Sequence, residues 1–205
     1  MVLKTAEVRW FYMGIVPSRL LAWFVAPDDR VTSEPPRTDH YLLVKDTDAL
    51  GIKYREGRIE VKQRLGSSRH VVFSEDTAGL VEQWQKWGFP LESAAEDCAT
   101  LEALDAWVAV EKARWLRDYR IDSDGRISVL DVPDLSIPSC SVELADLRVG
   151  DQRAWTLAFE AVGPTGTLTH TLERVARQVL GTLGGYALRA ADSYGYPRWL
   201  QITLM

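Results

Sequence analysis

Hydrophobic and polar residues alternate through the first segment of the chain. Over residues 2–13, Glu7 and Arg9 fall on one side of the alternation, and Val8 and Trp10 fall on the other. Successive side chains of a strand point to opposite faces, so this pattern predicts a strand with one charged face and one apolar face.

The same alternation continues in Gly51–Leu65, a segment rich in charge. Glu56-Gly57 is suited to a two-residue hairpin turn, which sets Lys53 opposite Glu60. Opposed residues of a hairpin share a face. One face then holds Lys53, Arg55, Arg58, Glu60, Lys62 and Arg64, and the other holds Ile52, Tyr54, Ile59 and Val61.

Three segments have the period of a helix. Ser18 is suited to cap a short helix that runs to Phe24. Residues 74–87 and 167–180 each carry an apolar stripe, which predicts two further amphipathic helices. The stripes consist of Leu80, Trp84 and Trp87 in the first, and of Leu168, Leu172, Val175 and Val179 in the second.

Shorter alternating segments predict the remaining strands. They cover residues 41–44, 107–114, 127–131, 139–147 and 154–161. Lys112 and Arg114 share one face of their strand, and Ala158 and Glu160 share one face of theirs. A short helix is expected within residues 92–106, and the aromatic tail is expected to be irregular.

Composition limits the classes of protein to consider. With 205 residues and no segment that resembles a linker, the chain is expected to form a single domain over residues 1–205. Its net charge of −5 argues against a general nucleic-acid binder and against a partner that is a nucleic-acid duplex. No apolar run is long enough to span a membrane, and Cys98 and Cys140 lack zinc-ligand spacing, so a cytoplasmic location is expected.

The charged strand faces have two interpretations. The solvated side of an antiparallel sheet is often charged, so these faces could simply meet water. Several strands repeat the pattern, however, while the helices supply a separate apolar cover. In a closed sheet such faces would converge on a lumen, where Arg and Lys are suited to phosphate and neighbouring carboxylates to Mg²⁺ or Mn²⁺.

The order of these charged segments resembles the CYTH, or triphosphate tunnel metalloenzyme, superfamily. The resemblance rests on Glu7 in the first strand, Asp39-His40-Tyr41-Leu42, Gly51-Ile52-Lys53-Tyr54-Arg55, Ile59-Glu60-Val61-Lys62, Glu111-Lys112-Ala113-Arg114, Val129-Leu130-Asp131 and Phe159-Glu160. It implies an α+β fold with an antiparallel β-barrel or tunnel of about eight strands and helices packed outside. It also implies an inward site for a triphosphate and a divalent metal.

Carried over by position, the resemblance assigns a role to each candidate residue. Phosphate binding falls to Lys53, Arg55, Lys62, Lys112 and Arg114. Metal binding, with Mg²⁺ or Mn²⁺ as the cofactor, falls to Glu7, Asp131 and Glu160. Catalysis falls to Glu60, Lys62 and Glu160.

The chain departs from the family pattern on the metal-binding side. Where the family opens with Glu-x-Glu-x-Lys, this chain has Arg9 and Phe11 after Glu7, and Ala158 replaces a later glutamate. Arg9 would weaken the binding of a divalent cation by charge repulsion.

Three functions are therefore expected to compete. The first is a metal-dependent triphosphatase, the second is a protein of the same fold that binds a phosphorylated small anion without catalysis, and the third is a scaffold whose charged faces meet solvent. Tyr194 and Tyr196 are expected either to line a tunnel mouth or to cover one end of the barrel. The substrate and the oligomeric state are left open.

Overall fold

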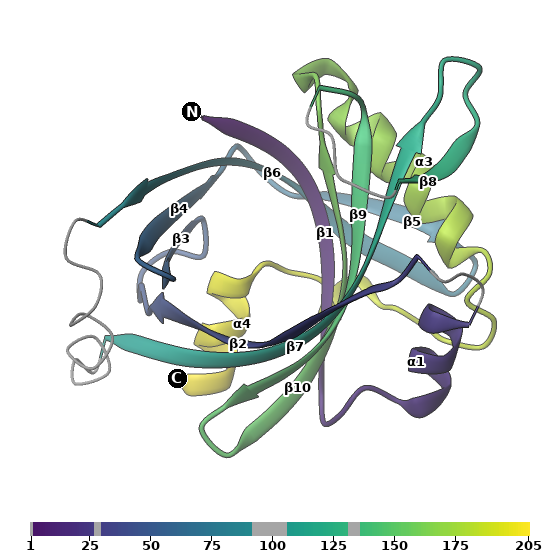
Figure 1. Ribbon diagram of the computed structural model, residues 1–205. Helices are drawn as coiled ribbons and strands as arrows, with labels where there is room; N and C mark the ends of the chain where they lie inside the picture. Colours follow the sequence, from purple (N-terminus) through teal and green to yellow (C-terminus); the bar gives the residue numbers. More distant parts are fainter. Residues whose placement is uncertain (1, 27–29, 92–105, 131–135) are drawn as a thin grey trace.

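Eight antiparallel strands close into a barrel in the computed structural model, which describes residues 2–26, 30–91, 106–130 and 136–205 (Figure 1). Around the ring the order is β1 (Leu3–Met13), β10 (Gln152–Val162), β9 (Ser139–Val149), β7 (Trp107–Ile121), β2 (Thr32–Leu42), β3 (Leu50–Arg55), β4 (Arg58–Arg64) and β6 (Thr77–Pro90). Pairing of β6 with β1 closes the ring. The predicted α+β fold with a β-barrel is confirmed.

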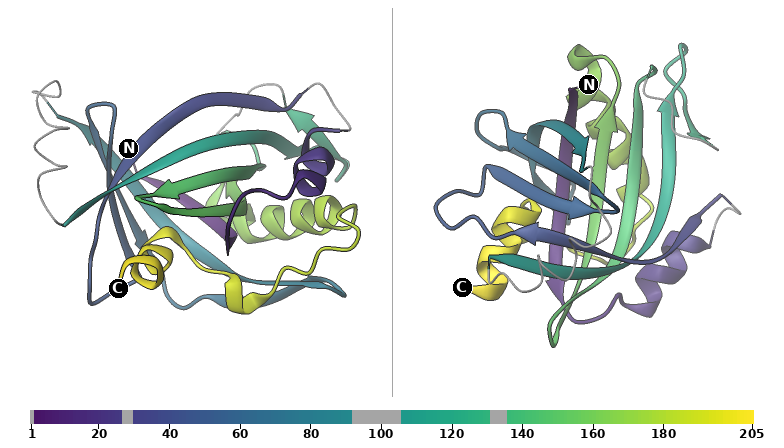
Figure 2. Two further views of the ribbon diagram at one scale, coloured as in Figure 1. Left: turned by 90° about the horizontal axis from the view of Figure 1, so that it is seen from below. Right: turned by 60° about the vertical axis from the view of Figure 1, so that its left-hand side comes forward.

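Further elements lie outside the ring. Strand β5 (Arg69–Ser74) pairs with β6, and β8 (Ile127–Leu130) pairs with β7. Helices α1 (Ser18–Val25) and α3 (Leu168–Leu180) lie on one side of the barrel, and α4 (Tyr196–Leu204) lies apart from both (Figures 1 and 2). Two short 3₁₀ helices, η1 (Thr165–Thr167) and η2 (Ala190–Asp192), complete the elements of the described residues.

The hairpin of β3 and β4 has the predicted register. Lys53 pairs with Glu60 and Arg55 pairs with Arg58. The two turn residues have positive φ angles, 48° at Glu56 and 72° at Gly57, as a type I′ turn requires. This turn fixes which side chains of the hairpin face the barrel interior.

The main apolar core lies outside the barrel, between its wall and the helices. Val8 and Trp10 of β1 and Leu157 and Phe159 of β10 are buried in it, together with Leu172 of α3. The predicted stripe of α3 is confirmed, because its other members also belong to this core or pack against it. Since the apolar strand faces point outward, the charged faces point into the barrel.

The predicted helix over residues 74–87 is wrong, because this segment forms the end of β5, a turn and most of β6. Trp84 and Trp87 have helical spacing, yet β6 is held on both sides by strands, β4 and β1. Tertiary pairing of this kind overrides a local pattern. Gly79 fits the strand, since a Cβ atom there would lie 2.6 Å from Trp10 Cζ2.

The tail is helical where an irregular segment was expected. Helix α4 buries Trp199 and Leu200 against barrel residues, and Trp199 stacks on Phe11 with ring centroids 4.9 Å apart. Tyr196 stacks on Tyr41 at 5.1 Å. A second core, formed by inward-facing residues of several strands together with α4, thus covers one end of the barrel.

Two expectations fall on residues that the structure does not describe. The short helix expected within residues 92–106 covers the undescribed residues 92–105, and Asp131 is also outside the described residues. Among the helices of the described part, none is long and apolar enough to cross a membrane.

Candidate functional site

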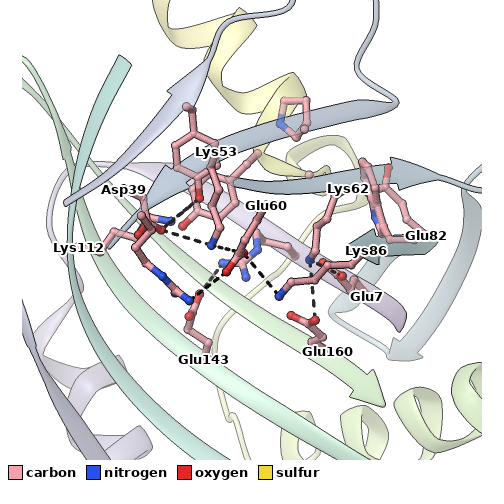
Figure 3. A pocket seen from close by; sticks show the side chains of 18 of the residues that line it. Glu7, Asp39, Lys53, Glu60, Lys62, Glu82, Lys86, Lys112, Glu143 and Glu160 are labelled. Carbon is pink, nitrogen blue, oxygen red and sulfur yellow. Dashed lines mark hydrogen bonds and ion pairs between the residues drawn. The ribbon is translucent and has the colours of Figure 1, made fainter. Parts of the chain in front are cut away.

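A cavity of about 170 Å³ lies inside the barrel, and charged side chains surround it (Figure 3). The structure brings together here every described residue to which a role was assigned: Glu7, Lys53, Arg55, Glu60, Lys62, Lys112, Arg114 and Glu160. The charged faces therefore do not simply meet bulk solvent. The scaffold interpretation, which required that, is wrong.

Six further charged residues line the cavity. Arg9 was noted only as a departure from the family pattern, and Asp39 was quoted without a role. The other four were missed: Arg37, Glu82, Lys86 and Glu143. Glu82 and Lys86 were hidden by the wrong helix, although their spacing of two around Trp84 is also a strand pattern.

The cavity lining carries an excess of positive charge. Among the described residues that line it, eight side chains are cations and six are carboxylates, which gives a formal net charge of +2. The whole chain, in contrast, has a formal net charge of −5. Most of these residues belong to three clusters of ion pairs, of which the first and the third are linked through Glu34 and Arg37.

The first cluster joins Arg9, Glu143 and Arg114. Arg9 Nη1 donates to Glu143 Oε1 at 2.8 Å, and Arg114 Nη1 donates to Glu143 Oε2 at 2.9 Å. Arg9 lies opposite Ala158, and Ala158 lies opposite Glu143. The arginine thus reaches across the small alanine to the next strand. Burial opposes ionisation of Glu143, but Arg9 and Arg114 outweigh it and hold the pKa of this carboxyl well below its usual range.

The second cluster joins Lys62, Glu7 and Glu160. Glu7 and Glu160 pair directly across β1 and β10. Lys62 Nζ donates to Glu7 Oε1 at 2.5 Å and lies 3.8 Å from Glu160 Oε1. Burial disfavours the charged form of Glu7, yet Lys62 outweighs this effect and lowers the pKa of Glu7. Burial likewise opposes the charge on Lys62, but Glu160 and Glu7 raise its pKa.

The third cluster centres on Asp39, whose side chain is fully buried. Lys112 Nζ lies 2.9 Å from Asp39 Oδ2, and Lys53 Nζ lies 3.7 Å from the same oxygen and 2.9 Å from Glu60 Oε2. Burial disfavours the charge on both lysines and lowers the pKa of each to about 8, although Asp39 opposes the shift. Burial also opposes ionisation of Asp39, but Lys112 and Lys53 outweigh this effect and hold the pKa of this carboxyl well below its usual range.

Aromatic rings of the covered end complete this cluster. Lys112 Nζ donates to Tyr41 Oη at 2.6 Å and lies 3.9 Å from the centroid of the Tyr196 ring. Tyr196 also lies beneath Arg9, whose Cζ is 4.9 Å from the ring centroid. Tyr196 therefore lines the cavity, whereas Tyr194 stacks on Phe11 in the second core.

The carboxylates of the described residues that line the cavity are paired with cations and are not grouped around a place for a metal ion. No group of three or more His, Cys, Asp or Glu side chains within the described ranges is placed to hold a metal ion. The ammonium of Lys62 lies between Glu7 and Glu160, the place that a divalent cation would need. With Asp131 undescribed, the assignment of Mg²⁺ or Mn²⁺ stays a prediction.

Comparisons with known proteins assign the chain to no family. No protein-family model matches the chain, and no curated protein matches its sequence. One similar solved structure is a conserved hypothetical protein from Pyrococcus furiosus, which is 13% identical. The match covers 95% of this chain and 98% of the other, with a TM-score of 0.46.

Proposed function

We propose that the barrel binds a triphosphate or another phosphorylated small anion in its basic interior. The observation that carries this proposal is the convergence of eight cationic side chains on one cavity that holds six carboxylates. Arg offers a planar fork and Lys a mobile point charge to phosphate oxygens. An anion-binding site needs cations only where they contact the ligand, so the proposal is compatible with the net negative charge of the whole chain.

The distribution of the cations favours a ligand with several charged groups. They come from six strands around the barrel, with Arg9 on β1, Arg37 on β2, Lys53 and Arg55 on β3, Lys62 on β4, Lys86 on β6, and Lys112 and Arg114 on β7. A chain of phosphates can contact cations on several walls at once. The order of charged segments that resembles the CYTH superfamily supports the same ligand class.

The carboxylates have a clear part in such a site. Without a ligand, buried cations need compensation, which the three clusters provide. A bound anion would exchange these ion pairs for contacts with phosphate oxygens. The affinity would then reflect a difference between two sets of charged interactions.

The test uses thermal stabilisation and calorimetry with inorganic triphosphate. Arg55→Ala and Arg114→Ala are informative because neither leaves a carboxylate without a cation. Glu60 keeps its ion pair with Lys53 at 2.9 Å in the first variant, and Glu143 keeps its ion pair with Arg9 in the second. Losing a hydrogen bond to a charged group costs roughly 1.5–3 kcal/mol, so each variant should bind about ten- to a hundredfold more weakly.

Arg148→Ala is the matched control, because this arginine is 56% exposed and lies outside the cavity. It should bind triphosphate like the wild type. If triphosphate stabilises all of these proteins equally, or stabilises none, the proposal fails.

Hydrolysis of the triphosphate with Mg²⁺ or Mn²⁺ is a second candidate. It is favoured by the direct pairing of Glu7 and Glu160. A bound triphosphate that draws Lys62 away from this pair would leave two carboxylates beside the phosphates, where they could hold a divalent metal ion. The assay is phosphate release from inorganic, nucleoside and thiamine triphosphates with either metal. Lys62→Ala and Glu160→Gln should abolish it, as should Glu60→Gln if Glu60 is catalytic. Absence of activity, or activity that these changes leave intact, would reject hydrolysis but not binding.

A further inference from the structure

A second cavity, of about 160 Å³, lies on the outer side of the barrel wall. It is bounded by α1, α3, β7 and β9, where the two helices cover the same side of the barrel (Figure 1). Trp23, Phe24, Tyr119, Val142 and Val179 make most of its wall apolar. None of its lining residues lines the interior cavity, so the two cavities are separate.

Arg117 provides the only positive charge among the described residues that line this cavity. Its Nε and Nη2 atoms are buried and have no hydrogen-bond partner. No carboxylate of the described residues lies within ion-pair distance of its guanidinium. Arg114, three positions earlier on β7, in contrast pairs with both Glu34 and Glu143.

An unpaired guanidinium in such a place calls for a partner. Arg117 as a whole is partly exposed, but two of its donor atoms are buried, and an unsatisfied buried donor points to a bound group. The Phe24 ring lies beside the guanidinium, with its centroid 5.6 Å from Arg117 Cζ, and it leaves the N–H groups of Nε and Nη2 free to donate to an anion. Trp23 cannot supply a second donor, because its Nε1 already donates to Thr182 Oγ1 at 3.0 Å.

We propose that this outer cavity binds a small organic carboxylate, with its charged group on Arg117 and its apolar body against Trp23 and Val179. One cation matches the single charge of a carboxylate better than the two charges of a phosphate group. The apolar wall favours an aromatic or branched aliphatic body over acetate. The small volume excludes large ligands.

Benzoate is the probe for this site, with calorimetry and thermal stabilisation as the measurements. Wild-type protein should bind benzoate, and Arg117→Met should bind it at least tenfold more weakly. Benzyl alcohol, which lacks the charge, and acetate, which lacks the ring, should both bind more weakly than benzoate. Arg120→Met, an exposed arginine of the same strand, is the matched control and should bind benzoate like the wild type.

Two further measurements separate binding from a structural role of Arg117. Without ligand, Arg117→Met should melt at the same temperature as the wild type or higher, because it removes two buried donor atoms that have no hydrogen-bond partner. Val179→Phe fills the cavity while keeping Arg117, and should also lose benzoate binding. Both variants should retain stabilisation by inorganic triphosphate, which keeps this test independent of the interior site.

Several outcomes would overturn the proposal. These are equal benzoate binding by wild type, Arg117→Met and Val179→Phe, absence of benzoate binding in the wild type, or a lower melting temperature of Arg117→Met together with unchanged binding. In an NMR spectrum of the wild type, the Nε–H signal of Arg117 should shift on addition of benzoate. A signal that stays in place would also contradict the proposal.

Discussion

At the scale of single residues, the arginine at position 9 and the alanine at position 158 are structurally linked. They lie directly opposite on β1 and β10, and the short side chain of Ala158 leaves room for Arg9 to reach Glu143 on β9. Both departures from the family pattern are visible in the sequence. Their compensation is not, because Glu143 is 134 positions from Arg9 and its contact depends on how three strands align.

Breaking this pair should destabilise the protein. Arg9→Met leaves Glu143 buried with Arg114 as its remaining partner, so the free energy of unfolding should fall by roughly 3 kcal/mol, the lower end for a broken buried ion pair. Adding Glu143→Gln should restore part of that loss, since Glu143 then no longer carries a buried charge with only Arg114 beside it. Urea denaturation of these two variants and of the single variant Glu143→Gln measures the coupling. Additive losses would show that the two side chains do not depend on each other.

The two lysines beside Asp39 should make triphosphate binding depend on pH. Each has a pKa lowered to about 8, so each loses its charge as the pH rises through 8, and the affinity should fall between pH 7 and pH 9. A bound anion favours the charged lysines, so binding near pH 8 should take up protons. Calorimetry in two buffers with different ionisation enthalpies measures this uptake. An affinity that stays constant from pH 7 to pH 9 would exclude these lysines from the site.

At the scale of secondary structure, the sequence predicted correctly those elements whose side-chain pattern fits either a strand or a helix, but not both. The hairpin of β3 and β4 was predicted to the residue, because Glu56-Gly57 fixes the turn and the turn fixes the register. In β6, the helical spacing of Trp84 and Trp87 competed with the strand spacing of Glu82 and Lys86. Only the neighbouring strands decide between these patterns, and the sequence does not display them.

Helix α4 should contribute strongly to stability through one residue. Trp199 is buried and stacks on Phe11, so Trp199→Ala should lower the free energy of unfolding by roughly 3–5 kcal/mol. Ile202→Ala is the control on the same helix, because Ile202 is 54% exposed, and its effect should stay within about 0.5 kcal/mol. Similar small effects of both changes in thermal denaturation would mean that α4 is not firmly packed on the barrel.

At the scale of the whole molecule, closure of the barrel creates a site that bulk properties conceal. The net charge of −5 gave no sign of an interior cavity whose described lining has a formal net charge of +2. The resemblance suggested that the strand faces converge. The pairing of β1 with β6 brings them together, and it joins segments about 80 residues apart, since Leu3 pairs with Lys86.

The buried carboxylates should make the whole barrel sensitive to acid. Three of them have pKa values in the folded protein below those of unfolded chains: Glu60, whose pKa is lowered to about 2, and Asp39 and Glu143, whose pKa values are lower still. The unfolded protein therefore binds more protons in acid, and stability present above about pH 4.5 should be lost as the pH falls toward 2. Thermal denaturation at pH 6, 4 and 3 measures this loss. A melting temperature that does not change over this range would show that these carboxylates are not held by the ion pairs described.

The central claim is that the barrel interior binds a phosphorylated anion, and a crystal structure with inorganic triphosphate tests it most directly. The expected result is triphosphate inside the barrel, with its oxygens about 2.7–2.9 Å from nitrogen atoms of Arg55, Arg114 and Lys53, the distance of a charge-assisted hydrogen bond. Triphosphate bound only to the outer surface, or an interior that keeps all three ion-pair clusters unchanged at saturating triphosphate, would contradict it.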